Sequence, residues 1–169
     1  MFDNLLENPI SFDDNGEYEV DECHLRHVRV GRRKYYKDIW IGGILERVTG
    51  MVLLYQLPDK TRTSMIPPIQ DNVPHGSFIY SDEYVVYRSL TALEYSHFSV
   101  NHSKKEYACK EIVGGEDINI HINTLEGVNH EIRQHFSNKS SRNTERVNLI
   151  LAEIMYRHSG RSLFSAFKI

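Results

Sequence analysis

Residues 17–57 read EYEVDECHLRHVRVGRRKYYKDIWIGGILERVTGMVLLYQL, and this stretch contains three runs of strand length. The runs are Glu17–His24, Asp38–Arg47 and Met51–Leu57, and the first alternates apolar and polar residues. Val48-Thr49-Gly50, between the second and third runs, has the composition of a turn. We therefore predict three consecutive strands that form an antiparallel meander, with Asp21 projecting from the middle of the first strand.

The chain after this meander alternates between helical and strand patterns. We predict a helix over Lys60–Val73 interrupted at Pro67-Pro68, a strand over Ser77–Tyr80, a short helix over Glu83–Leu93 and a strand over Tyr95–Asn101. A crossover helix returns the chain in its original direction, so the fourth strand should lie parallel beside the first. Asp82, directly after the fourth strand, should then lie close to Asp21.

Two helices complete the predicted fold. Leu125, Val128, Ile132 and Phe136 recur at helical spacing and predict an amphipathic helix over Asn123–Phe136. A last helix over Asn143–His158 should end before Gly160. The expected fold class is α/β, a mixed five-stranded sheet flanked by helices. We expect an N-terminal extension over residues 1–16, one domain over 17–158 and a tail over 159–169.

Composition excludes several classes of protein. The chain has 169 residues, 40% of them hydrophobic, which suits a single domain with a sizeable core. No apolar run is long enough to span a bilayer, and the acidic first residues do not resemble a signal peptide, so we expect an intracellular protein without a membrane partner. The only cysteines, Cys23 and Cys109, stand far apart, and this spacing favours two free thiols over a disulfide framework or a zinc site.

Positive charge is concentrated in one segment, although the net charge of the chain is -3. No acidic residue lies between His24 and Lys37, and Tyr35 and Tyr36 stand among the basic residues. Such a segment suits contact with a nucleic-acid backbone, but it is equally typical of a solvated basic hairpin. The candidate DNA-binding residues here are Arg26, Arg29, Arg32, Arg33, Lys34 and Lys37.

Three carboxylates on separate predicted elements are candidates for metal binding. Phosphodiester transfer is commonly catalysed by two divalent ions about 4 Å apart, and Mg²⁺ prefers a sparse set of carboxylate oxygens. Asp21, Asp82 and Glu126 would provide such a set. Arg133 lies seven residues after Glu126, on the same helix face, where it would meet a phosphate. From spacing alone, the same residues are also typical of exposed charges on a helix and at strand ends.

Ordered matches along the chain point to a family. The strings are VDEC (20–23), IWIGGILER (39–47), PDKT (58–61), GSFIYSD (76–82), VNHS (100–103), NTLEG (123–127) and LAEIMYR (151–157). In this order they closely resemble the ISXO-like insertion-sequence and Merlin group of DDE transposases. The resemblance covers about residues 17–157 and includes all three acidic positions.

The resemblance implies an RNase H-like fold and metal-dependent cleavage at transposon ends, followed by attack of the freed 3′ hydroxyl on target DNA. It implies that Asp21, Asp82 and Glu126 are the catalytic acids and that they bind two Mg²⁺ or Mn²⁺ ions. The expected partners are transposon-end and target DNA and further copies of the chain on that DNA. In a eukaryotic cell we expect a nuclear location.

Two departures from the family pattern leave other interpretations open. Asn129 stands where the group usually has Trp, and we expect no upstream DNA-binding region in this chain. One alternative is a transposase-derived DNA-binding or regulatory protein without turnover, which would bind DNA in a salt-sensitive manner. Another is a structure-specific nuclease on the same fold.

Overall fold

The computed structural model describes residues 12, 16–30, 36–100, 109–113, 116–137 and 144–159. The elements in chain order are β1 (Glu17–Arg29), β2 (Tyr36–Glu46), β3 (Val52–Leu57), α2 (Arg62–Asn72), β4 (Phe78–Asp82), the 3₁₀ helix η1 (Val85–Leu93), β5 (Ser96–Val100), β6 (Cys109–Val113), β7 (Glu116–Ile120), α3 (Asn123–His135) and α4 (Thr144–His158). Among the described helices, none is long and apolar enough to cross a membrane.

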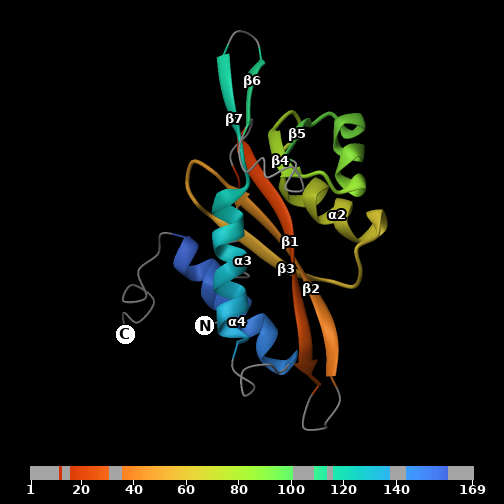
Figure 1. Cartoon of the computed structure of the whole chain (residues 1–169), viewed down its shortest axis with the longest axis vertical. Helices are drawn as coiled ribbons and strands as arrows, with labels where there is room; N and C mark the ends of the chain where they lie inside the picture. The colour runs from red at the N-terminus through yellow and green to blue at the C-terminus, as the bar shows by residue number, and fades with distance from the viewer. Residues whose placement is uncertain are drawn as a thin grey trace.

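A mixed five-stranded sheet in the order β3-β2-β1-β4-β5 forms the centre of the molecule (Figure 1). β1, β2 and β3 pair antiparallel, and β4 pairs parallel with both β1 and β5. The crossover through α2 brings β4 beside β1, with Tyr18 opposite Ile79 and Glu19 opposite Tyr80. The predicted meander and the predicted parallel neighbour of the first strand are both confirmed.

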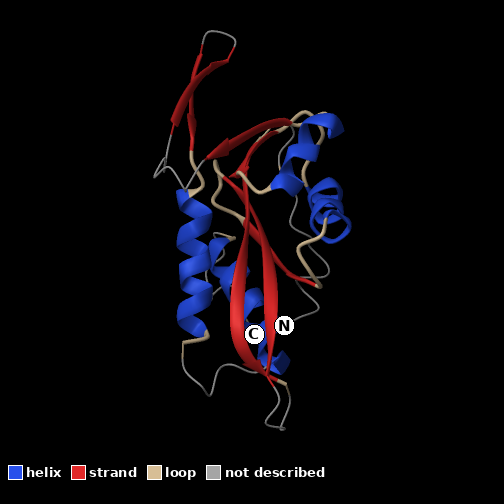
Figure 2. Cartoon of the chain, turned by 45° about the vertical axis from the view of Figure 1, so that its right-hand side comes forward, coloured by secondary structure: helices blue, strands red, loops and turns tan. Residues whose placement is uncertain are grey.

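Helices cover both faces of this sheet, with α3 and α4 on one side and α2 and η1 on the other (Figure 2). Each side buries a separate apolar core, as expected for a central sheet between two helical layers. The core under α3 and α4 includes Leu25, Ile41, Leu54, Leu125, Ile132, Val147 and Ile154. The core under α2 and η1 includes Tyr18, Val20, Ile44, Met65, Ile69, Tyr87 and Leu90.

Alternate residues of β1 contact different helical layers, because successive side chains of a strand point to opposite faces of the sheet. Asp21 and Cys23 both contact Asn129 of α3. Glu22 contacts Tyr87 of η1 on the opposite side. β1 therefore presents one series of polar groups to α3 and another to η1.

The two helices between β3 and β5 differ in detail from the prediction. α2 continues through Pro67 and Pro68 although the two rings remove two backbone donors. Burial of Met65, Ile66 and Ile69 against the sheet compensates for these lost hydrogen bonds. The second helix is a 3₁₀ helix that begins at Val85 rather than Glu83 and ends at Leu93, and its C-cap residue Glu94 has a left-handed φ of 66°.

A second, two-stranded sheet was not predicted. β6 and β7 pair antiparallel between β5 and α3 and project beyond the main sheet (Figure 1). The sequence between them contains Gly114-Gly115, a dipeptide typical of tight hairpins, which lies outside the described residues. This dipeptide would have supported a hairpin prediction.

Candidate active site

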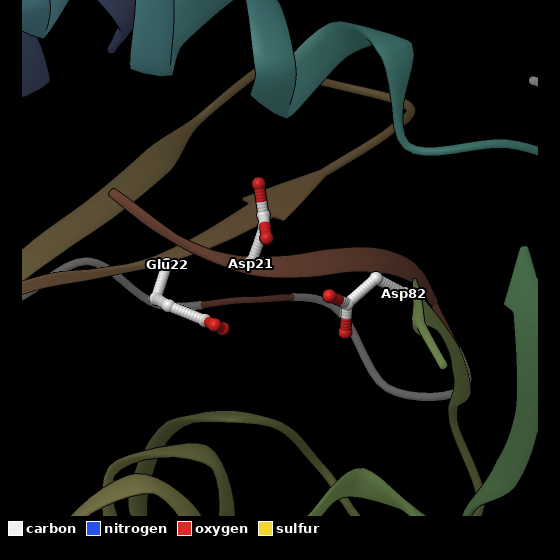
Figure 3. A group of neighbouring side chains, drawn as sticks. All are labelled: Asp21, Glu22 and Asp82. Carbon is white, nitrogen blue, oxygen red and sulfur yellow. The ribbon is translucent and has the colours of Figure 1, made fainter. Parts of the chain in front are cut away.

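The parallel pairing of β1 and β4 brings Asp21 and Asp82 together. Asp21 lies in the middle of β1 and Asp82 is the last residue of β4. One carboxylate oxygen from each of Asp21, Glu22 and Asp82 lies within 4.8 Å of the others, which makes this a candidate metal group among the described residues (Figure 3). The first two predicted acids are therefore neighbours.

Asp82 is oriented by the turn that follows its strand. Its Oδ1 accepts a hydrogen bond from the backbone N–H of Tyr84 at 2.9 Å, which is the geometry of an Asx-turn. Asp82 also lines a small pocket with Arg88 and His97. Burial lowers the pKa of His97 to about 4, so its ring is neutral at pH 7, where Nε2 lies 2.8 Å from Ser81 Oγ.

Glu22 was not predicted as a site residue, and both of its carboxylate oxygens already have partners. Lys60 Nζ forms an ion pair with its Oε1, and the hydroxyl of Tyr87 donates to its Oε2 at 2.9 Å. Lys60 Nζ also lies 4.0 Å from the centre of the Tyr84 ring. Asp21 points toward α3 in Figure 3, whereas Glu22 points toward the opposite layer. Glu22 is thus neutralised by a partner on the far side of β1.

Glu126 occupies the first turn of α3 and is half-buried. It is not part of the 4.8 Å group, and its negative charge makes the smallest contribution to the raised pKa of Asp21, after those of Glu22 and Asp82. The preceding residue is fixed: Glu19 Oε2 accepts the backbone N–H of Leu125 at 2.8 Å. Glu19 of β1 thereby anchors the turn that carries Glu126.

Two further residues bring α3 close to Asp21. Asn129 Nδ2 donates to Asp21 Oδ2 at 2.8 Å. Gly43, opposite Asp21 in the pairing of β1 with β2, has no side chain, and a Cβ there would lie 2.9 Å from Leu125 Cδ1. Gly43 therefore permits the close approach of the helix. Asn129 stood out in the sequence only as a departure from the family pattern.

The environment of Asp21 disfavours its charged form. Burial is the main cause, followed by the charge of Glu22 and then the charges of Asp82 and Glu126, and together they raise the pKa of Asp21 from 3.8 to about 7. A backbone hydrogen bond from Glu22 opposes this rise. A cation placed among these carboxylates would relieve their mutual repulsion. The cluster therefore has the negative charge that a metal-binding site requires.

We predict that Asp21→Asn stabilises the metal-free protein at pH 8. Since folding raises the pKa of Asp21 to about 7, the folded state keeps a proton that the unfolded chain releases, and stability falls as pH rises from about 4 to 7. Removing the titrating group should raise the free energy of unfolding by on the order of 1–4 kcal/mol at pH 8 and by little at pH 4. Urea denaturation in chelator at both pH values measures this.

The exposed Asp71 of α2 provides the control for that measurement, since Asp71→Asn removes one exposed carboxylate that is not among the causes of the raised pKa of Asp21. A gain for Asp21→Asn that is equal at pH 4 and pH 8 would contradict the argument from burial and repulsion.

The predicted DNA-binding residues lie at several places. Arg26 on β1 and Lys37 on β2 are exposed, and Arg29 ends β1 opposite Tyr36. Arg133 is an exposed residue of α3 whose Nη1 lies 3.5 Å from Cys23 Sγ. Arg32, Arg33 and Lys34 lie outside the described residues. Arg26, Arg29 and Lys37 thus belong to the β1–β2 pair, and Arg133 lies on the helix of Glu126.

Known structures share this fold. The catalytic core domain of HTLV-2 integrase, solved in complex with magnesium in a trimeric form, is 11% identical with a TM-score of 0.50, covering 87% of this chain and 86% of that one. The simian T-cell lymphotropic virus intasome, in complex with a PP2A regulatory subunit, is 12% identical with a TM-score of 0.51, covering 85% of this chain and 48% of that one. The predicted RNase H-like fold is confirmed by this likeness to integrase cores.

Sequence comparison gives the family directly. No curated protein matches the chain in sequence. The sequence profile described as the ISXO2-like transposase domain matches residues 15–159, which is most of the chain. With its mixed sheet, flanking helices and paired aspartates, the chain belongs to the ISXO2-like transposase domain family.

Proposed function

We propose that residues 17–158 form the catalytic domain of a DDE transposase, which cleaves DNA strands and joins the freed 3′ end to target DNA. In this proposal Asp21, Asp82 and Glu126 are the catalytic acids and bind two Mg²⁺ or Mn²⁺ ions. The observation that carries the proposal is the meeting of Asp21 and Asp82 at the junction of β1 and β4, beneath the helix that carries Glu126. Membership of the transposase family supports it.

The chemistry of the donor set fits such ions. Mg²⁺ and Mn²⁺ prefer oxygen ligands, and Mg²⁺ sites in proteins typically use one or two carboxylates together with water and substrate phosphate. Asp21 and Asp82 supply carboxylate oxygens within 4.8 Å of each other, and Glu126 supplies a third negative charge nearby. The magnesium in the HTLV-2 integrase structure is consistent with this assignment.

Bound divalent ions supply activation of the attacking oxygen and stabilisation of the leaving oxygen in phosphoryl transfer. The residues of the chain then have separate tasks. The Asx-turn holds the carboxylate of Asp82 toward Asp21. In this proposal Arg133, on the helix of Glu126, pairs with a phosphate of the DNA, and the exposed Arg26 and Lys37 contact the backbone further along β1 and β2.

DNA is the proposed partner, first as transposon ends and then as target. Cutting and joining two ends requires two catalytic sites, so we propose that several copies of the chain assemble on the DNA. Sizing of the chain with end DNA tests this part separately, and a monomeric cleaving complex would contradict it. With DNA as its substrate, the protein is proposed to act inside the cell, and in the nucleus of a eukaryote.

Labelled transposon-end DNA incubated with the chain and Mg²⁺ or Mn²⁺ tests the activity. We expect cleavage and joining that chelator abolishes and that Asp82→Asn abolishes without loss of DNA binding. Salt-sensitive binding without cleavage in either metal would instead indicate the regulatory protein. Cleavage of branched or flapped DNA irrespective of end sequence, without joining, would indicate the structure-specific nuclease.

A further inference from the structure

The side chain of Asn129 connects the helix of Glu126 to the strand of Asp21. Asn129 lies one helical turn after Glu126 and is 2% exposed. Its Nδ2 donates to Asp21 Oδ2 at 2.8 Å, a normal length for a hydrogen bond. The contact joins two elements that are far apart in the sequence, at the point where the candidate active site lies.

Asn129 is held by its backbone as well as by its side chain. The thiol of Cys23, two residues after Asp21 on the same face of β1, donates weakly to the carbonyl oxygen of Asn129 at 3.7 Å. The missing side chain of Gly43 lets this part of α3 lie close to the sheet. Because the amide is buried, its hydrogen bond to Asp21 Oδ2 is shielded from water and favours one orientation of the carboxylate.

An amide suits this position better than the alternatives. It donates a hydrogen bond without adding charge, whereas lysine or arginine would compete with a cation for Asp21. Aspartate would add a further carboxyl group to a cluster that already contains four, Asp21, Glu22, Asp82 and Glu126, and would increase the repulsion among them. An aliphatic residue would leave a buried carboxylate oxygen without its donor, which costs about 1–3 kcal/mol or more.

We infer that Asn129 is the positioning residue of this active site: its amide fixes the carboxylate of Asp21 in the orientation that binds a divalent ion. The inference rests on the proposed function, because it assumes that Asp21 is a metal ligand. Groups that orient a metal ligand typically contribute 10–100-fold to metal affinity. Asn129 would thus take a role in metal binding that no acidic residue of the sequence motif provides.

The test is calorimetric titration of Mn²⁺ into the metal-free chain, which reads binding without activity. Asn129→Leu keeps the size of the side chain and removes the donor, and Asn129→Ala removes the donor without adding any group. Val128→Ala is the matched control, since Val128 is the preceding residue of α3, is 3% exposed in the core and carries no donor. Asp21→Asn removes a proposed metal ligand and serves as the reference for the loss of a ligand.

We expect both Asn129 variants to bind Mn²⁺ about 10–100-fold more weakly than the wild type, and Val128→Ala to bind within about threefold of it. Unchanged affinity in a folded Asn129 variant would overturn the inference, as would an equal loss in Val128→Ala. Absence of Mn²⁺ binding by the wild type would instead overturn the proposed function, and this outcome is distinct from the other two.

Discussion

Glu126→Gln is expected to lower DNA cleavage by about 10³-fold or more, whereas Glu22→Gln is expected to leave cleavage within about tenfold of the wild type. Both substitutions keep the size of the side chain and remove one negative charge. They differ in which acid completes the metal site. Glu126 is the acid that the family resemblance assigns, while Glu22 is the third carboxylate of the 4.8 Å group.

The surroundings of Glu22 decide between the two. Both of its oxygens are engaged, one by Lys60 and the other by Tyr87, and its side chain is only 5% exposed. A metal ion bound to Glu22 would have to compete with the cation and the buried hydroxyl that already hold its oxygens, and Lys60 would repel the ion. Glu126 lies on α3, the helix toward which Asp21 points, and that position rather than its charge favours it, because the charge of Glu22 raises the pKa of Asp21 more than the charge of Glu126 does. Glu22 is therefore expected to stabilise the fold rather than to bind the metal ion.

Initial rates of cleavage of a labelled end substrate, in Mg²⁺ and again in Mn²⁺, measure this prediction. Asp21→Asn and Asp82→Asn serve as references for complete loss of the site. Thermal denaturation of each variant separates lost chemistry from lost folding, and Glu22→Gln is expected to lose about 1–3 kcal/mol of stability because Tyr87 and Lys60 lose a charged partner. An inactive, folded Glu22→Gln beside an active Glu126→Gln would reverse the assignment.

The order of the sheet was predictable because it follows from local patterns and one topological rule. The alternation of residues 17–24 and the apolar run of residues 51–57 indicate strands, and the crossover through α2 dictates that β4 lies parallel to β1. The same rule is sufficient to place Asp82 beside Asp21. The interruption predicted at Pro67 was wrong, because burial of the apolar face of α2 outweighs the missing donors.

The polar contacts of the site were not predictable from the same patterns. Asn129 reaches Asp21, and Lys60 reaches Glu22, only because α3 and the chain before α2 pack on opposite faces of β1. Periodicity indicates which residues share a face of one element, but it does not indicate which groups of two distant elements meet. The roles of Asp21, Asp82 and Glu126 as metal ligands remain predictions, supported by geometry and family.

Glu19→Gln is expected to destabilise the protein by about 3–5 kcal/mol, which for a chain of this size corresponds to roughly 10 °C in melting temperature. Glu19 is fully buried, and its carboxylate accepts hydrogen bonds from Arg47 Nε at 3.1 Å and from the backbone of Leu125 at 2.8 Å. His121 Nδ1 lies 3.2 Å from it, an electrostatic contact rather than a hydrogen bond. When Glu19 loses its negative charge, the positive charge of Arg47 loses its buried partner.

Glu17→Gln is the matched control, because Glu17 pairs with the same guanidinium at 3.1 Å but has a side chain that is 48% exposed. Solvent screens that pair, so its loss is expected to cost less than about 1 kcal/mol. Thermal and urea denaturation of the two variants compare one arginine with a buried and an exposed partner. Equal losses would contradict the claim that burial makes the Glu19 contact strong.

A double-mutant cycle with Arg47→Met then separates the ion pair from the anchoring of α3. Removing either partner of a buried pair leaves an uncompensated charge, so the double variant should lose less stability than the two single losses combined. The hydrogen bond to Leu125 is lost or weakened only when Glu19 changes, and it fixes the turn that carries Glu126. Glu19→Gln should therefore reduce cleavage more than Arg47→Met at equal stability. Purely additive stability losses would show that the pair is not coupled, and equal cleavage by the two variants would show that Glu19 does not position the helix.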